Sequence, residues 1–205
     1  STSEDSVRVT VYDTPGAHTH TFHVNAIRAE VIVTGAGSGG QSDVSDGLGG
    51  GSGATAIKTH DINSASASIT VGAGSLGGLP PAAGEDSTYN DGTNILTGGG
   101  GVVNDYADAS GGDINIRGAR GAYTATSVNV SGQASYWGQG GWWSAKGGAY
   151  GSGGGARGSA GSDAGQGQDG VVVVKEFLVV KPTPTYSTSR APKTTVYDTA
   201  GGPYT

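Results

Sequence analysis

The chain contains no cysteine, few charged residues and no long apolar run, and each of these absences excludes certain kinds of site or partner. Without cysteine there are no disulfides, thiolate metal sites or thiol nucleophiles. Only 14% of the residues are charged, the net charge is -6, and the 11 Lys and Arg residues form no basic stripe, so nucleic acid is not an expected partner. No apolar run approaches the roughly 20 residues of a membrane-spanning helix, so no membrane insertion is expected.

Hydrophobic residues are also scarce, whereas glycine is abundant. Hydrophobic residues make up 34% of the chain, against about 45–50% in average proteins, so a large conventional core is not expected. The 41 glycines must either leave the chain disordered or place it in an architecture ordered by backbone hydrogen bonds. Short dense clusters of valine, tyrosine and tryptophan favour the ordered alternative. Collagen is excluded because the glycines follow no three-residue period.

Strand patterns lie on both sides of the glycine-rich part. Three strand-like runs and a turn at 13–16 predict a three-stranded meander over residues 1–34. Residues 35–170 form a glycine-rich insertion with short strands. Residues 171–180 (VVVVKEFLVV) are apolar on both faces, so this closing strand should lie inside a sheet. We therefore predict an all-β fold with a β-sandwich-like base, the glycine-rich insertion and little or no helix.

The last segment, residues 181–205, contains several prolines and is expected to be an extended tail. Residues 195–201 (TVYDTAG) nearly copy residues 10–16 (TVYDTPG). The copy indicates either a continuing tandem array or a strand that pairs with a neighbouring subunit, although so short a match also arises by chance. In the second case Val196, Tyr197 and Asp198 are assembly contacts.

An ordered series of motifs spans roughly residues 14–177. It runs from the Pro-Gly turn at 15–16 through GSGATAIK (51–58), SITVGAG (68–74), GGDINIRG (111–118), ASYWG (134–138) and GAYGSGGG (148–155) to DGVVVV (169–174). This series resembles the glycine-rich domains at the ends of bacteriophage tail fibres and related phage adhesins. The resemblance implies a polyglycine II sandwich, in which extended segments with three residues per turn hydrogen-bond to their neighbours. It also implies a virion location and receptor contact through loops at the distal end.

The densest aromatic cluster comprises Tyr136, Trp137, Trp142, Trp143 and Tyr150. Planar amphipathic rings on a glycine scaffold suit sugar faces or protein hot spots, so these residues are candidates for receptor binding. The alternative is a local mini-core that holds glycine segments together. Trp142 and Trp143 are the better binding candidates, because adjacent residues of an extended backbone face opposite ways and one layer cannot bury both.

Two histidines, His18 and His20, lie on one face of a predicted strand. A homotrimer would bring six such imidazoles to its axis, where they could hold iron; the alternative is a solvated strand face. No other cofactor is predicted: residues 35–40 fit G-x-G-x-x-G, but no helix follows to receive a pyrophosphate. No nucleophile elbow, zinc-protease motif or carboxylate pair is present, so we expect no enzyme.

These observations predict a non-catalytic protein of the virion surface that binds a host cell-surface glycan or protein. Its other expected partners are virion proteins and further copies of itself. The alternatives are a capsid decoration or head-fibre protein, whose repeated TVYDT strands would join neighbouring subunits, and an extracellular filament protein, which would polymerise in isolation.

Overall fold

A computed structural model describes residues 6–42, 47–78, 80, 82–124, 130–156 and 164–179. The strands in this part of the chain are β1 (Ser6–Tyr12), β2 (Gly16–Thr21), β3 (Ala26–Thr34), β4 (Gln41–Ser42), β5 (Gly47–Leu48), β6 (Thr55–Asp61), β7 (Ser66–Val71), β8 (Ser87–Asn90), β9 (Ile95–Gly98), β10 (Ala109–Ser110), β11 (Ile114–Ile116), β12 (Tyr123–Thr124) and β13 (Val171–Leu178). The described residues contain no helix, so none of them forms a helix that could span a membrane. The all-β prediction is confirmed.

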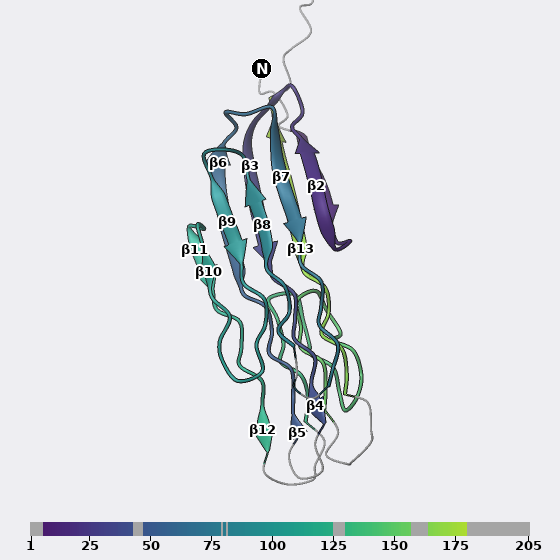
Figure 1. The fold of residues 1–205 in the computed structure, drawn as a ribbon. Helices are drawn as coiled ribbons and strands as arrows, with labels where there is room; N and C mark the ends of the chain where they lie inside the picture. The colour runs from purple at the N-terminus through teal and green to yellow at the C-terminus, as the bar shows by residue number, and fades with distance from the viewer. Residues whose placement is uncertain are drawn as a thin grey trace, which may run out of the picture.

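Two five-stranded antiparallel sheets form a sandwich at one end of the molecule (Figure 1). One sheet has the order β1-β13-β3-β6-β11 and the other the order β10-β9-β8-β7-β2. Alternate side chains from the two inner faces meet in the core, as period-two strands require. The core side chains include Val31, Val33, Val172 and Val174 from the first sheet and Ile69, Val71, Tyr89 and Leu96 from the second.

The predicted position of the closing strand is confirmed, but the predicted meander is wrong. β13 lies inside its sheet and pairs with both β1 and β3, so it separates two strands that we expected to be near neighbours. β2 belongs to the other sheet and pairs with β7. The chain therefore crosses between sheets at the turn between β1 and β2, and Gly16, the first residue of β2, has a φ of 121°, a value that favours glycine.

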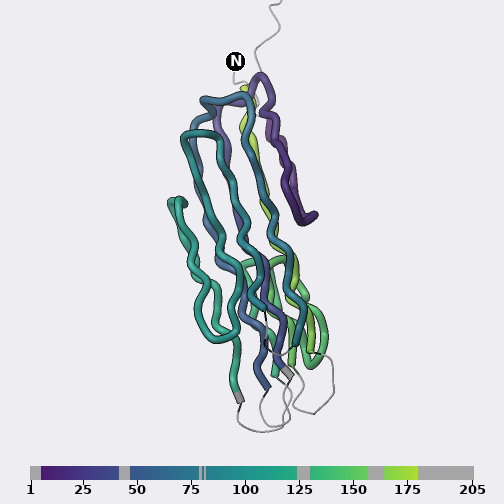
Figure 2. Tube along the Cα trace, viewed as in Figure 1, coloured from purple at the N-terminus to yellow at the C-terminus, as the bar shows by residue number. Residues whose placement is uncertain are grey.

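Beyond the sandwich, extended segments run side by side without forming regular sheets (Figures 1 and 2). We call them the glycine bundle; its segments are 35–40, 49–54, 72–78, 82–86, 98–103, 118–122, 131–134, 139–141, 152–156 and 164–170. The small sheet of β12, β5 and β4 lies at the end of the bundle away from the sandwich, which we call the distal end. The prediction of one insertion over residues 35–170 is therefore wrong: β6 to β11 from this range belong to the sandwich, and the segments between and beyond them form the bundle.

Hydrogen bonds within the bundle repeat every three residues. Gly35 donates its N–H to the Ala54 carbonyl oxygen at 3.0 Å. Three residues later, Ser38 donates to the Gly51 carbonyl oxygen, again at 3.0 Å. The backbone of segment 35–40 also exchanges hydrogen bonds with residues 75, 78, 85, 101, 154, 165 and 168. A three-residue period with several neighbours around each segment is the expected polyglycine II arrangement.

Glycine is required in the bundle wherever a neighbouring backbone lies so close to the Cα atom that a Cβ would not fit. A Cβ added at Gly50 would overlap the Ser38 carbonyl group and come within 2.9 Å of the Gly154 nitrogen. Those two groups are hydrogen-bonded to each other at 3.0 Å, so the methyl group would be inserted between them. By contrast, a Cβ at Gly78 would meet no atom within 4 Å. Close approach, rather than an unusual φ, therefore explains glycine at Gly50.

Candidate functional site

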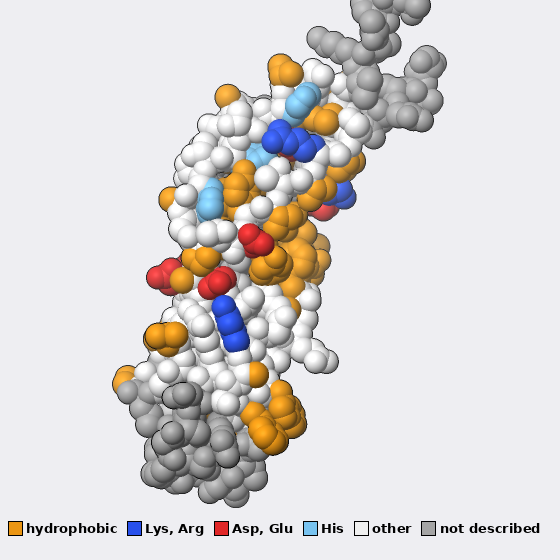
Figure 3. Space-filling model, turned by 90° about the vertical axis from the view of Figure 1, so that its right-hand side faces the viewer, with side chains coloured by type: hydrophobic (Ala, Val, Ile, Leu, Met, Phe, Trp, Pro, Cys, Tyr) orange, Lys and Arg blue, Asp and Glu red, His pale blue; other side chains and the backbone are white. Residues whose placement is uncertain are grey.

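The aromatic residues predicted as one cluster form two separate groups. Trp137 contacts Tyr136 and Tyr150 edge to face, with ring centroids 5.1 and 6.3 Å apart; we call these three residues the junction group. Trp142 and Trp143 contact each other instead, and we call them the tryptophan pair. On the face shown in Figure 3, apolar side chains likewise gather in separate places along the molecule, one of them toward the distal end.

The junction group joins the glycine bundle to the sandwich. The Trp137 indole N–H donates to the Thr34 hydroxyl oxygen at the end of β3, at 2.9 Å. The Tyr150 hydroxyl donates to the Asp13 carboxylate, also at 2.9 Å, and this bond raises the pKa of the tyrosine. Both rings are half-buried, whereas Tyr136 is exposed. These contacts match the mini-core alternative, so the junction group holds the two parts of the fold together.

The tryptophan pair is the most exposed part of the predicted cluster. The side chains of Trp142 and Trp143 are 65% and 48% exposed, and their rings stack with centroids 6.4 Å apart and planes 26° apart. The prediction that they face opposite ways is wrong, because the backbone here is a turn closed by the Ala145 N–H donating to the Trp142 carbonyl oxygen. Trp143 has a φ of 55°, which turns its ring to the side of its neighbour.

The backbone around this turn is fixed by the bundle. Just before the turn, the Gly141 N–H donates to the Gly153 carbonyl oxygen at 2.8 Å, and its carbonyl oxygen accepts from Gly132. Just after it, the Ala145 carbonyl oxygen accepts from the N–H of Gly155 at 3.0 Å. The two rings therefore stand on a rigid backbone platform rather than on a long loop.

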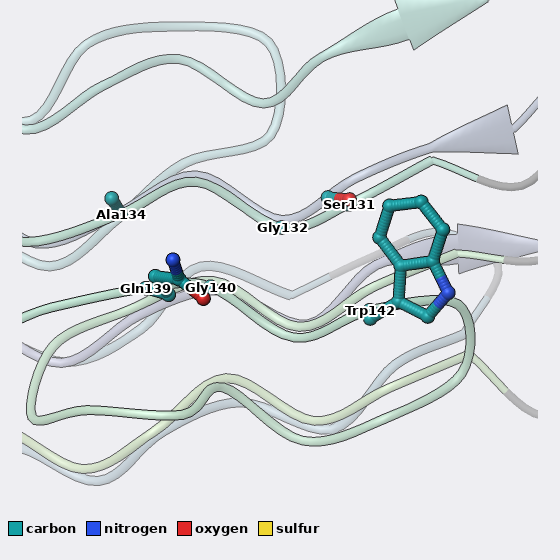
Figure 4. Close-up of a pocket in the computed structure, with 6 residues that line it drawn as sticks. All are labelled: Ser131, Gly132, Ala134, Gln139, Gly140 and Trp142. Atoms are coloured by element: carbon teal, nitrogen blue, oxygen red, sulfur yellow. The ribbon is translucent and has the colours of Figure 1, made fainter.

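A shallow groove of about 320 Å³ lies beside Trp142. It is lined by Ser131, Gly132, Ala134, Gln139, Gly140 and Trp142. Figure 4 shows the indole of Trp142 at one end of this groove and Gln139 toward the other. Ser131 lies against Gly49, the residue that follows β5, so the groove extends toward the distal end. None of the described lining residues carries a charge.

His18 and His20 lie on the same face of β2, as predicted, and both rings contact Tyr12. His18 Nε2 bonds to the Thr14 carbonyl oxygen at 2.7 Å. His20 is fully buried, and burial lowers its pKa despite the opposing effect of the Glu176 carboxylate. Among the described residues, no cluster of three or more potential ligands occurs. The iron site stays a prediction, and a buried His20 gives it no support.

A buried polar cluster around His20 was missed from the sequence. Its Nδ1 bonds to the Tyr12 hydroxyl at 2.9 Å, and its Nε2 lies 3.6 Å from Glu176 Oε2. The other oxygen of Glu176, which is fully buried, accepts the His23 backbone N–H. Arg8 lies 3.4 Å from the carboxylate and supplies the compensating charge. The sequence did contain a signal, since Glu176 alternates in phase with Val172 and Val174 on the inward face of β13, where the other side chains are apolar.

The proposed assembly contacts Val196, Tyr197 and Asp198 lie outside the described residues. Their N-terminal counterparts show what the repeated motif does where it is described. Val11 is exposed on the sheet, Tyr12 bonds to His20, and Asp13 bonds to Tyr150.

Comparison with known proteins identifies a family for most of the chain. The family model for a glycine-rich domain matches residues 13–177, which include the bundle, the groove and the strands of both sheets except β1 and the last residue of β13. No curated protein matches the chain. The protein belongs to the glycine-rich domain family.

Proposed function

We propose that the protein is a non-catalytic recognition module of the virion surface, at the tip of a tail fibre or in a similar adhesin. Its receptor would be a glycan or a protein on the host cell. The observation that carries this proposal is the exposed tryptophan pair on a rigid platform in the part of the molecule away from the sandwich. Tryptophan is the residue most enriched at binding hot spots, and a fixed backbone lowers the entropy lost on binding.

The backbone at Trp143 also favours a binding role. Trp143 is the only non-glycine residue with positive φ among those described, and a left-handed conformation costs about 1–2 kcal/mol for an ordinary side chain. Glycine would relieve this cost, and glycine is abundant everywhere around the turn. A bulky ring kept in a strained conformation is typical of functional sites.

The chemistry of the groove supports binding rather than catalysis. General acid–base catalysis needs a titratable group within reach of the substrate, and the described lining offers only an amide, a hydroxyl and an indole. The buried His20 and Glu176 lie in the sandwich core, where no substrate reaches them.

The experiment measures saturable binding of labelled protein to candidate host cells and its competition with adsorption of the phage. The double substitution Trp142→Ala/Trp143→Ala should abolish both, whereas Leu76→Ala, which truncates another exposed apolar side chain of the bundle, should change neither. Unchanged circular dichroism spectra would show that both variants fold. Equal binding by the double variant would refute the assigned site. No binding by the wild-type protein at micromolar concentration would favour a decoration or filament protein.

A further inference from the structure

The groove beside Trp142 has features that select one chemical class of ligand. Two of its six lining residues, Gly132 and Gly140, are glycines, so part of the lining is bare backbone (Figure 4). Its volume of about 320 Å³ lies at the lower end of the range of small-molecule sites, roughly 300–1,000 Å³. A groove of this size accommodates one or two ring-sized units rather than a folded protein loop.

The electrostatics of the groove favour an uncharged ligand. The described lining residues carry no charge, so nothing there would compensate a carboxylate, sulfate or phosphate group. Lys146, which follows the tryptophan turn, lies 3.7 Å from the Asp169 carboxylate, which offsets its charge. The net charge of the chain is -6, which adds a general repulsion toward anions.

The polar and aromatic groups of the groove match a sugar ring. The Trp143 ring lies beside the Trp142 ring, and the Trp142 side chain stays exposed. An aromatic face binds the apolar C–H face of a pyranose, while polar groups beside it bind the hydroxyls at the rim. The Gln139 amide offers both donors and an acceptor, and the Ser131 hydroxyl does the same.

We propose that the groove binds a neutral pyranose, a hexose or N-acetylhexosamine, of a host surface glycan. The sugar stacks on Trp142, and its hydroxyls bond to Gln139 and Ser131. This inference rests on the proposed recognition function and names its ligand class. A single small sugar site binds weakly, in the millimolar range, so strong attachment requires several copies of the site on one particle.

The direct test uses saturation-transfer NMR on the full chain with methyl glycosides of neutral hexoses and N-acetylhexosamines. N-acetylneuraminic acid serves as the anionic comparison. At least one neutral glycoside should bind, with affinity at least tenfold lower for Trp142→Ala and several-fold lower for Gln139→Ala. The variant Leu76→Ala should bind like the wild type. Binding of the anionic sugar alone, binding that survives Trp142→Ala, or no binding of any glycoside would overturn the proposal.

A second experiment distinguishes failure of the sugar-site proposal from failure of the proposed recognition function. Host cells are treated either with periodate, which oxidises sugar diols, or with protease, before binding of the labelled protein is measured. Loss of binding after periodate supports a glycan receptor. Binding that survives periodate but is lost after protease overturns the glycan assignment and leaves cell recognition intact. Absence of cell binding together with binding of a glycoside in the NMR experiment would overturn the recognition function and support the sugar site.

Discussion

One methyl group at Gly50 should destabilise the whole glycine bundle, because it would separate two backbones that are hydrogen-bonded to each other. The added Cβ overlaps the Ser38 carbonyl group and crowds the Gly154 nitrogen, so the bond between these groups must break. Each buried polar group left unpaired costs about 1–3 kcal/mol, and two such groups cost about 2–6 kcal/mol. Domains have a total stability of about 5–15 kcal/mol, so this is a large share.

The assay compares the thermal unfolding of the variants Gly50→Ala and Gly78→Ala, with circular dichroism as the signal for unfolding. A loss of about 4 kcal/mol corresponds to a melting temperature about 10 °C lower for a chain of this length. Gly78 has open space at its Cα, and its N–H bond to the Gly40 carbonyl oxygen at 3.1 Å remains available to alanine. Gly78→Ala should therefore leave stability unchanged or raise it by about 0.4–1 kcal/mol through the unfolded state. Equal melting temperatures for the two variants would show that close backbone approach does not determine where glycine is needed.

Three further predictions concern the tryptophan turn, the buried imidazole and the junction. In urea unfolding, Trp143→Gly should be more stable than Trp143→Ala by about 1 kcal/mol, because glycine adopts positive φ without strain. If the alanine variant were the more stable of the two, the turn would not be strained. Burial lowers the pKa of His20 below its usual value of about 6.5, so the unfolded chain binds a proton more readily than the folded chain. The free energy of unfolding should therefore fall as the pH drops below about 6.5, by up to about 1.4 kcal/mol per pH unit. His20→Phe should flatten melting curves recorded between pH 7 and 5, and an unchanged slope would exclude His20 as the cause. Tyr150→Phe and Asp13→Ala should each cost about 1 kcal/mol and not add in the double variant, because both remove the same hydrogen bond; additive losses would count against that contact.

Local sequence patterns predicted most strands but not their partners. The apolar run of β13 indicated a strand inside a sheet, and the turn before Gly16 was read correctly. The meander failed because β13, far away in sequence, takes the place between β1 and β3. Alternating residues reveal which face of a strand is buried, but they contain no information on which strand lies alongside.

The candidate site shows the same limit at the level of single residues. The clustering of aromatic residues along the sequence made Trp142 and Trp143 candidates, but the assumption of an extended backbone oriented them wrongly, because nothing in a tryptophan indicates positive φ. Trp137 was grouped with them by proximity in sequence, although its indole bonds to Thr34 at the sandwich. Separating a structural ring from an exposed one required the long-range contacts of the fold.

The three-residue repeat of hydrogen bonds determines how this fold tolerates changes in length. A segment of the bundle that gains three residues advances by one full turn, and every N–H again faces its former neighbour. A gain of one or two residues rotates the segment, so that side chains replace glycine at the points of closest approach. Lineages that remodel the distal loops should therefore keep insertions within the segments to multiples of three, while the turns between segments vary freely. The hydrogen-bond repeat thus fixes the permitted lengths of the bundle segments and leaves the lengths of the turns between them free.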